Sequence, residues 1–163
     1  MPLIKNGAFV ADRFIFIPEG QAFPEDGGVM VTLERFQSER DTLLAHHQPL
    51  AVRLTAADNP EALKDDLSQI AAIALEFPVY KDGRAFSWAR MLRDRFEYKG
   101  EIRAVGHFLY DQLAFMVRVG FDAFDVRQDF RIEEFARAMG EMTYVYQPTV
   151  DRRKTVIDIR WGK

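Results

Sequence analysis

Cysteine is absent from this sequence, and histidine is scarce, with only three copies. Without cysteine the chain can form no disulfide, thiol nucleophile, thiolate zinc site or cysteine-bound iron–sulfur cluster. Three histidines also argue against a histidine-rich metal centre. The sequence further lacks the glycine-rich G-x-G-x-x-G and P-loop motifs of nucleotide-binding proteins, the H-E-x-x-H motif of zinc proteases and the G-x-S-x-G motif of serine hydrolases. These absences exclude the enzyme classes that short motifs identify most readily.

A strong excess of one charge and a membrane-length hydrophobic run are also lacking. The 22 basic and 25 acidic residues give a net charge of −3, so no cationic field attracts nucleic acid or an anionic membrane. The apolar stretch 14–17 is far shorter than a membrane span, and no basic leader followed by an apolar run is present. We expect a cytoplasmic protein without nucleic-acid or membrane partners.

The chain does contain enough apolar residues to form a hydrophobic core. It has 163 residues, 48% of them hydrophobic, and phenylalanine is abundant with 14 copies. A chain of this size can bury a stable hydrophobic core without disulfides or a structural metal. Because no linker or low-complexity segment divides it, we expect a single domain over residues 1–163.

Short apolar runs alternate with amphipathic helical stretches along most of the chain. The expected strands are 29–33, 50–54, 70–75, 102–105 and 123–126, and the expected helices are 37–47, 60–67, 84–98, 108–119 and 132–142. This alternation is typical of a parallel sheet with right-handed crossovers. It predicts an α/β fold of about five parallel βα units, either as an open sheet or as a half-barrel.

Additional β segments are expected at the two ends of the chain. The aromatic stretch 8–17 predicts a strand or hairpin, and 143–146 with 156–161 predicts a second hairpin around a polar turn. Aromatic edge strands can pair across a two-fold axis, so we expect a homodimer.

Residues 81–87 follow an expected strand and begin an expected helix. Asp82 can cap this helix, and the free N–H groups and dipole there favour an anion. Gly83 would allow close backbone approach, while Arg84 and Ser87 would add a forked donor and a hydroxyl. The segment is interpreted either as a small oxyanion site or as a capped helix with an exposed arginine.

The rest of this helix supports a surface interpretation. Arg90 and Arg93 stand four residues before Asp94 and Glu97, the spacing of surface ion pairs on a helix. Gly100 is expected to end the helix in the left-handed conformation.

Each expected strand carries one charge at or near a buried position, and the signs alternate along the chain. These residues are Glu34, Arg53, Glu76, Arg103 and Asp125. Charges inside a parallel sheet are costly unless they are paired. They therefore form either an internal paired network or a ligand cleft at one end of the sheet.

Two residues of the next strand-to-helix turn could carry acid–base chemistry. His107 can exchange a proton near neutral pH, although such a histidine can equally cap or pack. Asp111 falls in the first helical turn, where a carboxylate is favoured by the helix dipole alone.

Over residues 76–127 the sequence resembles a bacterial family called domain of unknown function 934. The resemblance is carried by Phe77-Pro78, Asp82-Gly83-Arg84-Ala85-Phe86-Ser87, Ala89-Arg90, Tyr98-Lys99-Gly100-Glu101-Ile102-Arg103-Ala104-Val105-Gly106, Asp111-Gln112 and Gly120-Phe121-Asp122-Ala123-Phe124. Members of this family are described as oxidoreductases involved in sulfite reduction, and their genes lie beside assimilatory sulfite reductase.

The resemblance implies a role in assimilatory sulfate or sulfite reduction. The ligand-binding candidates among the matching positions are Asp82, Gly83, Arg84, Ser87, Arg90, Arg103, Gly106 and Gln112, and the acid–base candidates are Asp111 and His107. Without a cysteine or a nucleotide fingerprint, the chain cannot be the catalytic subunit of sulfite reductase. We expect no cofactor, with a flavin bound without a fingerprint left open.

Three functions stay open at this point. The first is an accessory protein that binds a small oxyanion or the sulfite reductase system. The second is an enzyme acting on an anionic sulfur or phosphate-bearing metabolite, and the third is a non-catalytic homodimeric interaction protein.

Overall fold

The structure is a computed structural model that describes residues 1–24 and 26–162. Its strands are β1 (Leu3–Lys5), β2 (Ala8–Val10), β3 (Phe14–Phe16), β4 (Gly28–Thr32), β5 (Leu50–Leu54), β6 (Ala72–Phe77), β7 (Glu101–Gly106) and β8 (Ala123–Asp125). Its helices are α1 (Leu33–Ser38), α2 (Arg40–Ala45), α3 (Arg84–Asp94), α4 (Leu113–Val119), α5 (Ile132–Gly140) and α6 (Val156–Arg160), with 3₁₀ turns at Pro60–Leu63 and Tyr110–Gln112. In these two ranges, no helix has the length and apolar character that crossing a membrane requires.

The strands form one sheet whose centre is a run of parallel βα units. Within the described residues the strand order is β2-β1-β8-β7-β6-β5-β4-β3. From β4 to β8, neighbours in the sheet follow chain order and pair in parallel. Helical segments follow each of these strands. This arrangement confirms the expected α/β fold of about five parallel βα units.

The sheet is strongly curled, because a short connection joins its two edge strands. β2 and β3 lie at opposite edges, yet only residues 11–13 separate them in the chain. The backbone from Val10 to Phe14, even fully extended, spans about 14 Å at most. A flat sheet with this strand order would separate β2 from β3 by about 34 Å. Of the two predicted arrangements, the structure is therefore the half-barrel, open between β2 and β3. The N-terminal β segments are present as β1, β2 and β3.

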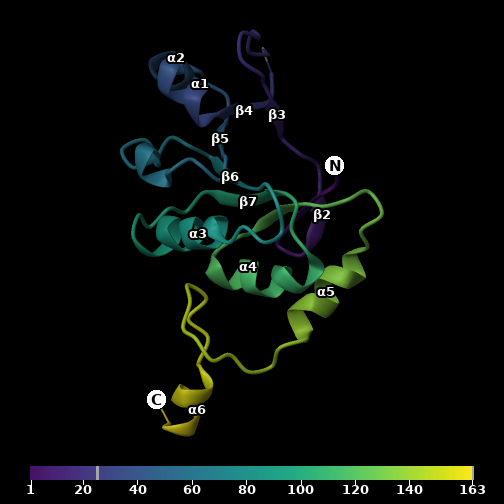
Figure 1. Cartoon of the computed structure of the whole chain (residues 1–163). Coiled ribbons are helices and arrows are strands. Elements are labelled where there is room, and N and C mark those ends of the chain that lie inside the picture. The colour runs from purple at the N-terminus through teal and green to yellow at the C-terminus, as the bar shows by residue number, and fades with distance from the viewer. Residues whose placement is uncertain (25, 163) are drawn as a thin grey trace.

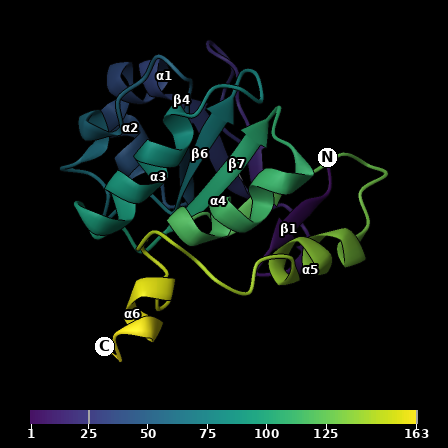
Figure 2. The same cartoon turned by 60° about the horizontal axis from the view of Figure 1, so that its bottom comes forward.

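The two faces of the sheet differ in the size of their side chains. The outer face carries bulky residues such as Leu75 and Phe77, which pack under the helices. Figures 1 and 2 show α3 and α4 side by side on this face. At the centre of the inner face lie Ala51, Ala72 and Ala74, all fully buried, and around them Phe14, Met30 and Val105 complete the cluster. Small side chains there leave space inside the curl for charged side chains of the same strands.

Two helix ends depend on residues with a left-handed backbone. Gly120, with a φ of 114°, ends α4 as expected. The prediction that Gly100 ends α3 was wrong, because α3 ends earlier and Glu97, with a φ of 53°, makes the turn. This turn directs Tyr98 inward, where its hydroxyl donates to the carbonyl oxygen of Ile70 at 3.0 Å. The buried tyrosine explains why the helix stops before the expected residue.

The C-terminal hairpin expected at 143–146 and 156–161 does not occur in the described residues, and this prediction was wrong. A loop leads instead to α6, which stands away from the sheet in Figures 1 and 2. Oγ1 of Thr155 accepts from the backbone N–H of Asp158 at 3.2 Å, and the Asp158 carboxylate accepts from the backbone N–H of Thr155 at 2.9 Å. This reciprocal capping box starts a helix where the apolar alternation had indicated a strand.

Candidate functional site

The charged residues expected inside the strands pair with one another on the inner face of the sheet. Arg53 on β5 and Glu76 on β6 form an ion pair at 3.1 Å, as the alternating signs indicated. Asp125 on β8 lies 3.9 Å from Arg103 on β7. Glu34 does not belong to this group, because it is exposed on α1 and not on a strand. Arg53, Glu76 and Arg103 thus follow the paired-network alternative, whereas Asp125 also faces a cavity at the end of the sheet.

Arg103 is the buried centre of this network, with a side chain that is 1% exposed. Its Nε donates to Glu101 Oε1 at 2.9 Å, and its two terminal nitrogens donate to the carboxylate of Asp12 at 2.7 and 3.0 Å. Glu101 also accepts from Lys5 Nζ at 2.7 Å. Burial opposes the charge of Arg103, but the hydrogen bonds from Arg103 to Asp12 and the charge of Glu101 raise its pKa. The guanidinium therefore already binds carboxylates of this chain.

The start of α3, where an oxyanion site is predicted, also holds a carboxylate of the chain itself. Asp82 Oδ1 accepts from the backbone N–H of Arg84 at 3.1 Å and from its Nε at 3.0 Å. The hydrogen bonds from Arg84 lower the pKa of Asp82 to about 2. Gly83 is exposed at the cap of the helix, and Ser87 is exposed one turn later. Asp82 therefore offsets the positive charge that an incoming anion would meet.

The two other arginines of α3 have different roles. Arg90 pairs with Asp94 at 3.1 Å on the surface, as expected. The expected pair of Arg93 with Glu97 was wrong, because Glu97 lies in the turn after the helix. Arg93 instead donates to two carbonyl oxygens of the loop that follows α3, each at 2.7 Å. These hydrogen bonds from Arg93 hold the loop between α3 and β7 in place.

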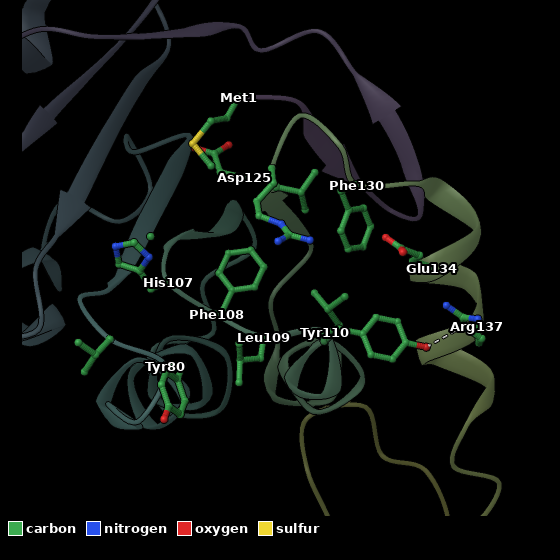
Figure 3. A pocket seen from close by; sticks show the side chains of 15 residues that line it. Met1, Tyr80, His107, Phe108, Leu109, Tyr110, Asp125, Phe130, Glu134 and Arg137 are labelled. Atoms are coloured by element: carbon green, nitrogen blue, oxygen red, sulfur yellow. Dashed lines mark hydrogen bonds between the residues drawn. The ribbon is translucent and has the colours of Figure 1, made fainter.

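A cavity of about 610 Å³, here named the β7–β8 cavity, lies beyond the carboxyl ends of β7 and β8. Its walls come from the loops after β6, β7 and β8 and from α5 (Figure 3). This end of a parallel sheet or barrel is where ligands bind in α/β folds. The volume falls in the range of pockets that hold organic ligands.

Asp125, the last residue of β8, presents a carboxylate to this cavity. No described residue donates a hydrogen bond to that carboxylate, and Arg103 is 3.9 Å away. Burial raises the pKa of Asp125, and the positive charge of Arg103 offsets this effect only in part. An acid with a raised pKa in a cavity is a candidate for ligand contact or proton transfer.

Aromatic side chains form much of the cavity surface. Phe108 is half-buried, and its ring packs against Phe77 and Phe124 with centroid distances of 6.0 and 6.3 Å. Phe130, also half-buried, comes from the loop between β8 and α5. In Figure 3 both rings lie between Asp125 at one end of the cavity and Tyr110 at the other.

Polar groups lie at the end of the cavity near α5. The hydroxyl of Tyr110 donates to Glu141 Oε1 at 2.7 Å and accepts from Arg137 Nε at 3.3 Å. Arg127, from the loop after β8, also lines the cavity. Its ion pair with Asp129, at 3.5 Å, is exposed on both sides.

Comparison with protein-family models gives a match over residues 51–157 to the family described as "Bacterial protein of unknown function (DUF934)". The chain belongs to the DUF934 family. The matched range includes β5 to β8 and every residue that lines the β7–β8 cavity except Met1. Neither the comparison with curated proteins nor the comparison with solved structures found a match.

The remaining predicted residues of this DUF934 protein lie in or near the cavity. Gly106 and His107 line it, and His107 is exposed. Gln112 stands behind the wall, accepting from the backbone N–H of Leu109 at 2.9 Å and donating to the carbonyl oxygen of Tyr80 at 2.9 Å. It thereby holds the loops after β6 and β7 together. Asp111 is exposed and does not line the cavity.

Arg127, Phe130 and Arg137 line the cavity but were not predicted as site residues from the sequence. Asp125 was recognised only as a strand charge. Its place at the end of an expected strand was a usable signal, because ligands bind at that end of parallel strands. The residues on the loop after β8 and on α5 carried no motif that could have identified them.

Proposed function

We propose that this DUF934 protein is an accessory protein of assimilatory sulfate and sulfite reduction that binds a small anionic metabolite in the β7–β8 cavity. One observation carries the ligand-binding part: the cavity of about 610 Å³ lies beyond the ends of two parallel strands and contains the carboxylate of Asp125. The resemblance over residues 76–127 supports the link to sulfite reduction.

Arginines supply the charge that an anion needs. Arg127 and Arg137 both line the cavity, and Glu134 on α5 lines it beside Arg137 (Figure 3). The ion pair of Arg127 with Asp129 has side chains 78% and 75% exposed, so water screens it strongly. A guanidinium fork matches the geometry of carboxylate, phosphate and related oxyanions. An anion in the cavity would therefore replace a weak surface pair.

Ligand-dependent melting of the full-length chain tests this binding. Sulfite, sulfate, phosphate and nucleotides are added separately, and a ligand at about 100 times its Kd should stabilise the fold by about 2.7 kcal/mol. For a chain of this size that is a shift of about 5–10 °C. The shift should disappear in Arg127→Gln and persist in Arg84→Ala. A shift lost only in Arg84→Ala would place the ligand at the start of α3, and no shift with any compound would refute binding.

Growth of a deletion strain tests the pathway. We expect the strain to fail on sulfate and on sulfite and to grow on sulfide or cysteine, because only sulfite reduction would be interrupted. Normal growth on all four sulfur sources would contradict the assignment.

The proposed role also implies partners in the cytoplasm. Sulfite reductase or its electron donor would bind this accessory protein, and co-purification with the reductase tests that contact. The C-terminal segment offers a surface for a homodimer, since Tyr146 and Trp161 are 73% and 70% exposed. Large exposed aromatic side chains are enriched at protein–protein contacts.

A second candidate function is favoured by the raised pKa of Asp125. An acid of this kind, in the same cavity as the exposed His107, could transfer protons to or from an anionic sulfur or phosphate-bearing metabolite. Turnover with a bell-shaped pH–rate profile that Asp125→Asn abolishes would establish an enzyme. Binding without turnover would contradict it.

A further inference from the structure

We infer that the ligand of the β7–β8 cavity is a heteroaromatic anion: a planar ring with N–H donors, joined to a phosphate or a similar oxyanion group. This inference rests on the proposed function of the cavity. It goes further by naming the chemical class that the walls of the cavity recognise.

The size of the cavity is the first argument. Its volume of about 610 Å³ is in the range of pockets for organic ligands. An inorganic oxyanion such as sulfite would fill a small part of it and would contact only one wall. A ligand that contacts both the strand ends and α5 must have an organic body between its polar ends.

The aromatic walls are the second argument. Phe108 is held from behind by Phe77 and Phe124, so its position is fixed by the core. Phe130 lines the same cavity from a different loop, and Figure 3 shows both rings near its middle. Aromatic side chains bind planar rings by stacking, with a preference for offset or edge contacts. The middle of the cavity is therefore suited to a planar ring.

The polar ends of the cavity are the third argument, and they set the direction of the ligand. Asp125 can only accept hydrogen bonds when ionised, and no described residue donates to it. A ring N–H would satisfy this acceptor, whereas an oxyanion at the same place would be repelled. Arg127 and Arg137 also line the cavity and would attract the anionic group. In Figure 3 Arg137 lies at the α5 end of the cavity, away from Asp125, so the ring edge faces Asp125 and the anionic group faces Arg137.

Isothermal titration of the full-length chain with a matched set of probes tests this assignment. Guanosine monophosphate and flavin mononucleotide carry a ring with N–H donors and a phosphate. Ribose 5-phosphate keeps the phosphate and sugar without the ring, and inorganic phosphate keeps the anion alone. We expect at least one ring-bearing probe to bind, and ribose 5-phosphate to bind roughly tenfold more weakly or worse.

Variants of the chain assign the contacts. Phe130→Leu keeps an apolar side chain and removes the ring, so it should weaken the ring-bearing probe roughly tenfold and leave ribose 5-phosphate unchanged. Arg127→Gln should weaken both kinds of probe. Arg84→Gln, on an arginine outside the cavity, is the control and should change neither.

The titration results separate loss of the ring assignment from loss of anion binding. If ribose 5-phosphate or inorganic phosphate binds as tightly as the nucleotides, the cavity binds anions and the ring assignment is wrong. If Phe130→Leu leaves nucleotide affinity unchanged, the ring does not lie in this cavity. If sulfite binds and no ring-bearing probe does, the proposed function stands and this inference falls. If none of the compounds binds, both fall.

Discussion

Replacing Arg103 with methionine should destabilise the protein more than any other removal of a strand charge. Glu101, with a side chain 2% exposed, would keep only Lys5 as a partner, and Asp12 would lose the guanidinium that holds it. Breaking a buried ion pair costs about 3–5 kcal/mol. Because Lys5 still holds Glu101, we expect the lower end of this range, about 3 kcal/mol.

The chain contains a matched control on the same inner face. Arg53 pairs with Glu76 across neighbouring strands, but the side chains are 33% and 26% exposed. Water screens that pair, so Arg53→Met should cost about 1 kcal/mol or less. The comparison separates burial of the pair from its chemistry, since an arginine is replaced by methionine in both variants.

Urea unfolding followed by tryptophan fluorescence and circular dichroism measures both variants. A loss of about 3 kcal/mol lowers the melting temperature of a chain of this size by about 6–12 °C. The double variant Arg103→Met, Glu101→Gln should regain part of the loss, because the buried negative charge is gone. Equal losses for Arg103→Met and Arg53→Met, or a loss below about 1 kcal/mol for Arg103→Met, would show that burial does not make the Arg103 ion pairs more important than the Arg53–Glu76 pair.

Three further results are expected. The raised pKa of Asp125 means that the protonated carboxyl stabilises the fold, fully below pH 3.8, and that this stabilisation is lost as the pH rises through the folded pKa. Asp125→Asn should therefore unfold at a higher urea concentration than wild type at pH 7, and the gain should shrink toward pH 4. A gain that does not depend on pH would contradict this prediction. Gly106→Ala should cost about 1–3 kcal/mol in urea unfolding, because φ is 92° and a Cβ would lie 2.5 Å from the carbonyl oxygen of Phe77; a neutral effect would show that the backbone at the carboxyl ends of β6 and β7 can relax. Light scattering should give a dimer for wild type and a smaller mass for Tyr146→Ser, Trp161→Ser, whereas a monomeric wild type at micromolar concentration would refute the homodimer.

The alternation of strands and helices was predictable because it depends on the local pattern of apolar and polar residues. Apolar runs of strand length alternate with amphipathic stretches, and each run in the middle of the chain became a strand of the parallel sheet. The C-terminal segment shows the limit of that approach. A short run such as 156–161 fits a strand or one helical turn equally well, and the capping box of Thr155 and Asp158 decided for the helix.

The site was predictable only where it depends on strands. Alternating charges correctly paired Arg53 with Glu76. The main partner of Arg103 was not predictable, because Asp12 is 91 residues away in sequence and reaches it only through the connection between the sheet edges. The cavity brings together loops after three strands and one face of α5, and no motif marks such a convergence.

If the protein acts through the β7–β8 cavity, filling that cavity should abolish its function in the cell. Complementation of the deletion strain on sulfate measures this, with Leu109→Trp as the decisive variant. Leu109 lines the cavity and is 45% exposed, so a larger ring there fills the cavity without entering the core. We predict that Leu109→Trp melts like wild type yet fails to restore growth, while Arg84→Ala restores it. Full growth with Leu109→Trp, or failure with Arg84→Ala, would contradict the account.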